Sequence, residues 1–133
     1  MSEENVELAR RGYEAYNRDG PYAIIEYLDP EVEWGTPEQD LYMTGTYRGH
    51  EGVRQFLDQF FELFEEARIE PEEFIQAGER VVVPFLFTAR TRETGIELTE
   101  RWAHVWTIRN GKAVRLDQYT DPDNALEAAG LSE

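Results

Sequence analysis

The segment Leu98–Tyr119, with the sequence LTERWAHVWTIRNGKAVRLDQY, carries the strongest hairpin signal in this chain. Two runs rich in aromatic and β-branched residues flank Asn110-Gly111, a dipeptide that is typical of a two-residue hairpin turn. We therefore expect two antiparallel strands, over residues 98–109 and 112–119, joined by a tight turn.

A two-residue turn also predicts which side chains share a face, because side chains alternate along a strand. It pairs Arg109 with Lys112 and places His104 opposite Asp117. On the face of His104 we expect Trp102, Trp106, Arg115 and Tyr119. On the other face we expect Ala103, Val105, Thr107, Val114, Leu116 and Gln118.

His104 and Asp117 are the candidate catalytic residues of this hairpin. A carboxylate partner favours protonated histidine, and an apolar surround raises the pKa of a carboxyl group, so the two groups could exchange protons near neutral pH. The alternative is a structural pair that satisfies its own hydrogen bonds. The surrounding tryptophans favour a small-molecule site, which is typically apolar with a few converging polar groups.

The strand over residues 80–91 extends this face. If Thr94-Gly95 is also a two-residue turn, Phe85 and Phe87 lie on the side of His104, whereas a slip of one residue would turn both away.

The N-terminal half is predicted to be helical. Apolar residues at helical spacing indicate helices over residues 2–17, from Pro21 onward, and over 53–67, with a short extended piece at 32–34 and a loop at 35–49 between the last two. A strand at 72–76 and a last helical turn or two at 123–130 complete the pattern. Helices followed by antiparallel strands predict one α+β domain over residues 1–133, with helices on one face of a twisted sheet. If the sheet is strongly curved, the helices close a cone-shaped pocket, and the element pattern does not fix that curvature.

Composition excludes several classes of function. The net charge is −15, and residues 1–79 hold 20 acidic and 6 basic side chains, so nucleic acid is a poor partner. The chain has no Cys, its serines are Ser2 and Ser132 near the two ends, and its one lysine is Lys112, which argues against a covalent nucleophile. Its two histidines have no metal-ligand spacing, which argues against a metal site. No apolar run suits a membrane span, and an acidic N-terminus lacks the charge of a secretory signal, so we expect a cytoplasmic protein without metal or cofactor.

The chain resembles the nuclear transport factor 2-like superfamily, in particular its SnoaL-like, polyketide cyclase-like branch, which is related to ketosteroid isomerase. The resemblance rests on ARRGYEAYN (9–17), LDPEVEW (28–34), YRGHEGV (47–53), RWAHVW (101–106), NGK (110–112) and ALEAAGL (125–131). It implies a cone-shaped fold, a hydrophobic pocket, no cofactor, and a homodimer. We expect the dimer contact on the sheet face that carries Val105, Val114 and Leu116.

The resemblance transfers to particular residues only in part. Ketosteroid isomerases carry a general-base Asp after the first strand, where this chain has Trp34, with Glu33, Glu38 and Asp40 nearby. Their oxyanion hole pairs a first-helix Tyr with a sheet Asp, and here Tyr13 or Tyr16 lies near the former and His104 stands at the latter. SnoaL-like cyclases use a sheet Asp with a nearby His.

The expected function is therefore binding of a small hydrophobic, carbonyl-containing molecule, with cofactor-free acid/base chemistry of the cyclase or isomerase type. The alternative is a non-catalytic binding or accessory protein, which would follow if Gln118 took the place of Asp117. The candidate catalytic residues are Asp117 and His104, and no residue is predicted to bind a metal. The candidate substrate-binding residues are Tyr13, Tyr16, Trp34, Phe85, Phe87, Trp102, Trp106 and Tyr119.

Overall fold

A computed structural model describes residues 2–37 and 45–131 of the chain. The helices are α1 (Ser2–Asp19), the 3-10 helix η1 (Pro21–Tyr27), α2 (Gly49–Leu63) and α3 (Pro122–Ala128). The strands are β1 (Leu28–Thr36), β2 (Gly45–Arg48), β3 (Phe64–Pro71), β4 (Ile75–Ala77), β5 (Arg80–Thr91), β6 (Glu97–Arg109) and β7 (Lys112–Tyr119). None of the described helices combines the length and apolar character that crossing a membrane requires.

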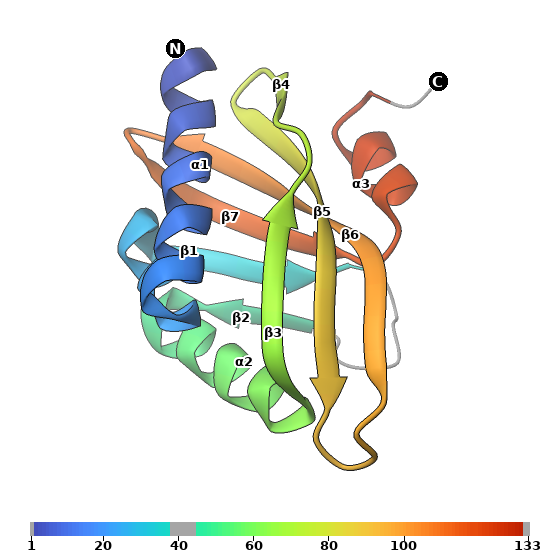
Figure 1. The fold of residues 1–133 in the computed structure, drawn as a ribbon. Helices are drawn as coiled ribbons and strands as arrows, with labels where there is room; N and C mark the ends of the chain where they lie inside the picture. The colour runs from blue at the N-terminus through green and yellow to red at the C-terminus, as the bar shows by residue number, and fades with distance from the viewer. Residues whose placement is uncertain (1, 38–44, 132–133) are drawn as a thin grey trace.

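The strands form one mixed sheet in the order β2-β1-β7-β6-β5-β3, and β4 pairs with β5. The neighbours β1 and β7 are parallel, and the other strand pairs are antiparallel. Figure 1 shows the sheet bending strongly, so that β3 runs across the direction of β1 and β2. The predicted α+β class, with N-terminal helices on a curved and mostly antiparallel sheet, is confirmed.

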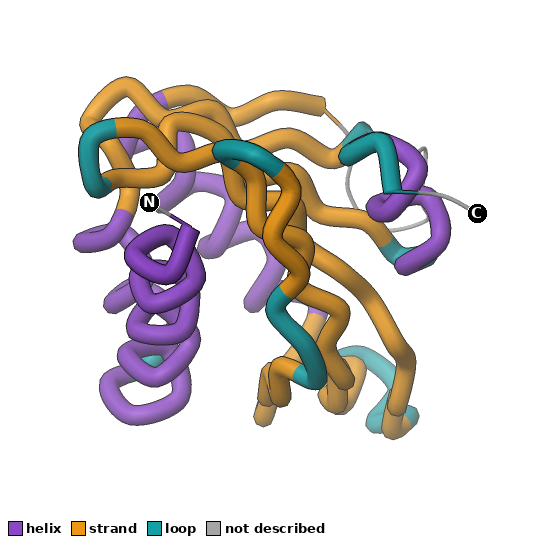
Figure 2. Tube along the Cα trace, turned by 90° about the horizontal axis from the view of Figure 1, so that it is seen from above, coloured by secondary structure: helices purple, strands orange, loops and turns teal. Residues whose placement is uncertain are grey.

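The two faces of the sheet are covered by different helices. The helices α1, η1 and α2 pack on the concave face, and their apolar side chains share one core with aromatic residues of β5 and β6. Helix α3 lies on the other side of the sheet (Figure 2), over a smaller cluster of Val82, Ala103, Val105, Tyr119 and Ala125.

Helix α2 begins and ends four residues before the predicted helix over 53–67, and β2 lies within the expected loop. The chain becomes extended at Phe64, with φ −127° and ψ 147°, and continues as β3 instead of helix. Phe64 is fully buried in this strand. Because the same aromatic residue fits the core from a helix or from a strand, the apolar spacing alone did not reveal the boundary. Strand β3 therefore pairs with β5 from Phe64 to Pro71, and of the strand predicted at 72–76 only Ile75 and Gln76 are extended, in β4, which also pairs with β5.

The hairpin of β6 and β7 begins as predicted and then departs from a regular register. Asn110 and Gly111 have φ of 53° and 77°, which suits a tight hairpin turn, and Arg109 pairs with Lys112. Ile108 then pairs with Ala113, but Thr107 pairs with Arg115. The extra residue, Val114, is a β-bulge, which turns every later side chain of β7 to the opposite face.

The predicted pairing of His104 with Asp117 is therefore wrong. His104 lies opposite Gln118, and Asp117 lies opposite Val105. The bulge buries Leu116 completely in the main core and lets Arg115 reach the outer face. Without it, a guanidinium would face the core and a leucine would face outward. The sheet face expected to form a dimer contact thus lacks Leu116, and the homodimer stays a prediction.

The connection between β5 and β6 also differs from the prediction, with a smaller effect. The N–H of Thr91 donates to the carbonyl of Ile96 at 2.9 Å, which closes a loop of four residues instead of two. Phe85 consequently pairs with Trp102 and not with His104. A shift by two residues keeps each side chain on its face, so Phe85 and Phe87 lie on the His104 side as expected.

The bulge makes a clear prediction for stability. Replacing the buried Leu116 with Ala should lower the free energy of unfolding by about 2–5 kcal/mol, because it leaves a cavity in the core. The matched change Val114→Ala, at the half-buried bulge, should cost about 1 kcal/mol or less. Urea denaturation of both variants measures the difference. Equal losses, or a larger loss for Val114→Ala, would contradict the bulged register.

Candidate functional site

His104 lies at the centre of a buried chain of hydrogen bonds under helix α1. The indole Nε1 of Trp106 lies 2.8 Å from the hydroxyl of Tyr13, which lies 2.7 Å from Nδ1 of His104. The other ring nitrogen of His104, Nε2, lies 3.1 Å from Oε1 of Gln118. These contacts connect α1, β6 and β7 through the core.

The available donors give each bond a direction. An indole N–H only donates, so Trp106 donates to the hydroxyl oxygen of Tyr13. Gln118 offers a carbonyl oxygen, so His104 donates from Nε2 and accepts the Tyr13 hydroxyl proton at Nδ1. A neutral imidazole satisfies all three bonds at once.

Burial favours the neutral forms of these groups. It lowers the pKa of His104 from 6.5 to about 4, while the hydrogen bond with Gln118 acts in the opposite direction. Burial also raises the pKa of Tyr13 well above its ordinary value, against a smaller lowering by the Trp106 bond, and raises that of Tyr16. Near neutral pH the imidazole and both phenols are therefore uncharged.

The close approach of α1 to the sheet depends on a glycine. A Cβ atom at Gly12 would lie 2.8 Å from the indole ring of Trp106. With glycine there, the helix comes near enough for its next residue, Tyr13, to reach His104.

A cavity lies beside His104, between the concave face of the sheet and the helices. Six of the predicted site residues line it, namely Tyr16, Trp34, Phe85, Phe87, Trp102 and His104. Tyr13 and Trp106 are also on this side of the sheet but do not line the cavity: Tyr13 bonds to His104, and Trp106 bonds to Tyr13. The cavity volume is about 20 Å³, enough for roughly one water molecule, so aromatic side chains fill most of the space expected for a pocket.

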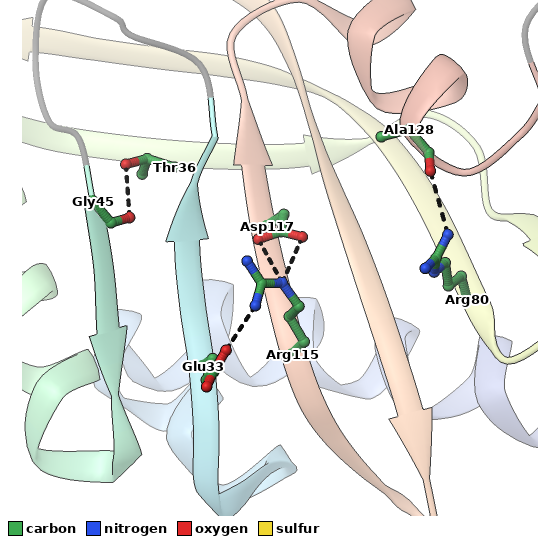
Figure 3. Close-up of polar contacts among 7 residues, drawn as sticks. All are labelled: Glu33, Thr36, Gly45, Arg80, Arg115, Asp117 and Ala128. Carbon is green, nitrogen blue, oxygen red and sulfur yellow. Dashed lines mark hydrogen bonds and ion pairs between the residues drawn. The ribbon is translucent and has the colours of Figure 1, made fainter.

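Two predicted site residues lie on the outer side of the sheet instead. Tyr119 packs in the small cluster under α3. Asp117 accepts two hydrogen bonds from Nε of Arg115, at 2.9 and 3.1 Å, and Nη1 of Arg115 lies 2.7 Å from Oε1 of Glu33 on β1 (Figure 3). A Cβ at Gly35 would lie 2.5 Å from Oδ1 of Asp117, so glycine makes room for this carboxylate.

Sequence reasoning missed part of the lining. Gln118 entered only as the outcome of a register slip, and the apolar side chains of α2 were not among the candidate site residues. The alternation of charged and apolar residues in Arg115-Leu116-Asp117 was the available signal, because the two charged side chains favour the exposed face. The lining residues beyond those predicted are Ile24, Phe56, Leu57, Phe60, Phe61, Ile69 and Gln118.

The described residues contain no group of three or more His, Cys, Asp or Glu side chains arranged to hold a metal ion. Glu38 and Asp40, which lie near Trp34 in the sequence, are outside the described residues. What the described site offers is uncharged hydrogen-bonding groups in an aromatic enclosure.

Comparison with known proteins agrees with this geometry. The SnoaL-like domain model matches residues 9–116. An NTF2-like protein of unknown function from Burkholderia pseudomallei is 32% identical, with a TM-score of 0.80 over 96% of this chain and 97% of that one. The structure of TerC co-crystallised with polyporic acid is also 32% identical, with a TM-score of 0.78 over 96% of this chain and 98% of that one.

A hypothetical protein of ketosteroid isomerase-like fold from Catenulispora acidiphila, in complex with trimethylamine, is similar in fold alone. It is 14% identical, with a TM-score of 0.73 over 94% of this chain and 93% of that one. No curated protein matches the chain. The family model covers most of the sequence, and the concave sheet with its N-terminal helices is common to these structures. The chain therefore belongs to the SnoaL-like domain family and has the NTF2-like cone fold.

Proposed function

We propose that this protein binds a small, predominantly aromatic molecule in the cavity beside His104, as a binding or accessory protein. The observation that carries the proposal is the lining itself. It consists of aromatic and aliphatic side chains with His104 and Gln118 among them, and no carboxylate or cationic side chain of the described residues takes part. Such a surface favours apolar ligands that carry few polar atoms.

The position of Gln118 favours binding over acid/base catalysis. Proton transfer near neutral pH needs a group whose pKa lies near the working pH. Gln118 does not titrate, and His104 is held neutral with both ring nitrogens in hydrogen bonds. Asp117, the acid of the catalytic hypothesis, pairs with Arg115 on the outer face.

The similarity to TerC supports an aromatic ligand. That protein was co-crystallised with polyporic acid. Here a molecule of comparable size requires the lining side chains to move, because the cavity measures about 20 Å³. Rotamer changes of this kind are common on binding. The lining side chains that α2 contributes are apolar, among them Leu57, Phe60 and Phe61.

Ligand binding should appear as thermal stabilisation. Cyclic and polycyclic aromatic ketones and polyporic acid would be titrated in a thermal-shift assay, followed by mass spectrometry of the recovered compound. At a ligand concentration 100 times Kd we expect a gain of about 2.7 kcal/mol, with the compound recovered unchanged. Leu57→Phe, which adds bulk to the lining, should weaken binding at least tenfold. Leu63→Phe, at an exposed position of the same helix, should not.

Two outcomes of this screen would contradict the proposal. If no compound stabilises the protein, or if both phenylalanine variants bind equally well, the cavity is not the binding site. Conversion of a ketone to product that is lost in Asp117→Asn would instead favour the catalytic hypothesis.

The neutral state of His104 predicts how stability depends on pH. Between about pH 6.5 and pH 4 the unfolded chain protonates this histidine while the folded protein does not. The unfolded state then binds more protons, so stability falls as the pH falls through this range. His104 should contribute about 3 kcal/mol to this loss.

Urea denaturation of the native protein and of His104→Asn at pH 7 and pH 4.5 tests this contribution. The variant is expected to be less stable at both values but to lose less on acidification. If the two proteins lose equal stability between these values, His104 is not held neutral by burial.

A further inference from the structure

The three tryptophans of the chain differ in how their indole N–H groups are satisfied. Trp102 donates to Oε1 of Glu100 at 2.8 Å, and Trp106 donates to the hydroxyl of Tyr13 at 2.8 Å. Trp34 is only 3% exposed, so water does not reach its Nε1 atom. That atom has no hydrogen-bond acceptor among the described residues. A buried N–H without an acceptor is rare in native proteins because it loses its bond to water.

Trp34 belongs to the cavity lining. It lies on β1 beside Leu116 of β7, with its ring 5.0 Å from Phe56 and 5.7 Å from His104 between centroids. The two nitrogens of His104 are already engaged with Tyr13 and Gln118. Trp34 is therefore a lining residue whose indole N–H the described side chains leave without an acceptor.

We propose that Trp34 determines the ligand class of this site by donating its indole N–H to a carbonyl oxygen of the bound molecule. This inference rests on the proposed binding function and adds the group that the ligand must carry. An aromatic hydrocarbon would leave the N–H unpaired, whereas a ring ketone supplies an acceptor. A hydroxyl group would also bring a donor, which needs an acceptor in the lining. Nδ1 of His104 already accepts from Tyr13, and Oε1 of Gln118 already accepts from His104.

Matched ligands separate this inference from the proposed function. Isothermal titration calorimetry would compare 1-tetralone with tetralin, which has the same rings without the carbonyl, and with 1-tetralol. We expect the native protein to bind the ketone at least tenfold more tightly than either, a difference of about 1.4 kcal/mol. Trp34→Phe should bring the ratio of ketone to hydrocarbon affinity close to one.

Trp102→Phe is the matched control, since it also shortens an aromatic wall but removes an N–H that is already paired with Glu100. It should weaken both ligands alike and keep the preference for the ketone. A preference lost equally in both variants would show that ring size, and not the N–H of Trp34, sets the selectivity.

A spectroscopic measurement on the native protein covers the case in which Trp34→Phe does not fold. The three indole N–H groups give separate ¹⁵N–¹H signals, which the conservative variants Trp102→Phe and Trp106→Phe assign by elimination. Saturating 1-tetralone should move the Trp34 proton downfield by more than the other two, and tetralin should not. If both compounds bind with equal affinity and equal indole shifts, the role of Trp34 is wrong and the binding function stands. If neither binds, the proposed function itself fails.

Discussion

The β-bulge at Val114 determines which chemistry faces the interior of this protein. One extra residue in β7 exchanges the two faces of the strand from residue 115 onward, so Leu116 and Gln118 enter the core while Arg115 and Asp117 leave it. The exchange is stabilised on both sides. Inside, a leucine is buried, and outside, the Asp117 carboxylate accepts two hydrogen bonds from Arg115 above the glycine of the neighbouring strand.

The buried hydrogen-bond chain follows from that exchange. Gln118 gives His104 a neutral acceptor, and Tyr13 gives it a neutral donor, so the imidazole is satisfied without charge in a site where a charge would be costly. An aspartate at that point would have favoured protonated histidine. The apolar, uncharged character of the cavity thus depends on which of two adjacent residues in β7 faces inward.

The sequence was sufficient for α1, for the strands β5, β6 and β7, and for one face of the sheet. Asn110-Gly111 specified its turn because both residues adopt positive φ, and Phe85 and Phe87 kept their face because the register error there was even. The bulge was not predictable from the turn, since it lies three residues beyond it and depends on tertiary burial of Leu116 and on pairing of Arg115 with β1. The same dependence on tertiary context hid the boundary at Phe64, where a helix and a strand bury the same ring.

The distribution of charge agrees with this division of the sheet. Most of the excess acid lies in residues 1–79, and the charged residues of β7 that follow the turn point away from the cavity. An aromatic enclosure that has no charged side chain among the described residues disfavours ionised ligands, because they would lose their hydration, and favours neutral rings. Within such an enclosure a single unsatisfied donor has a large influence, because few other groups compete to orient the ligand. In this fold the sheet register turns Arg115 and Asp117 away from the cavity, so the proposed ligand selectivity depends on uncharged hydrogen-bonding groups such as the indole of Trp34.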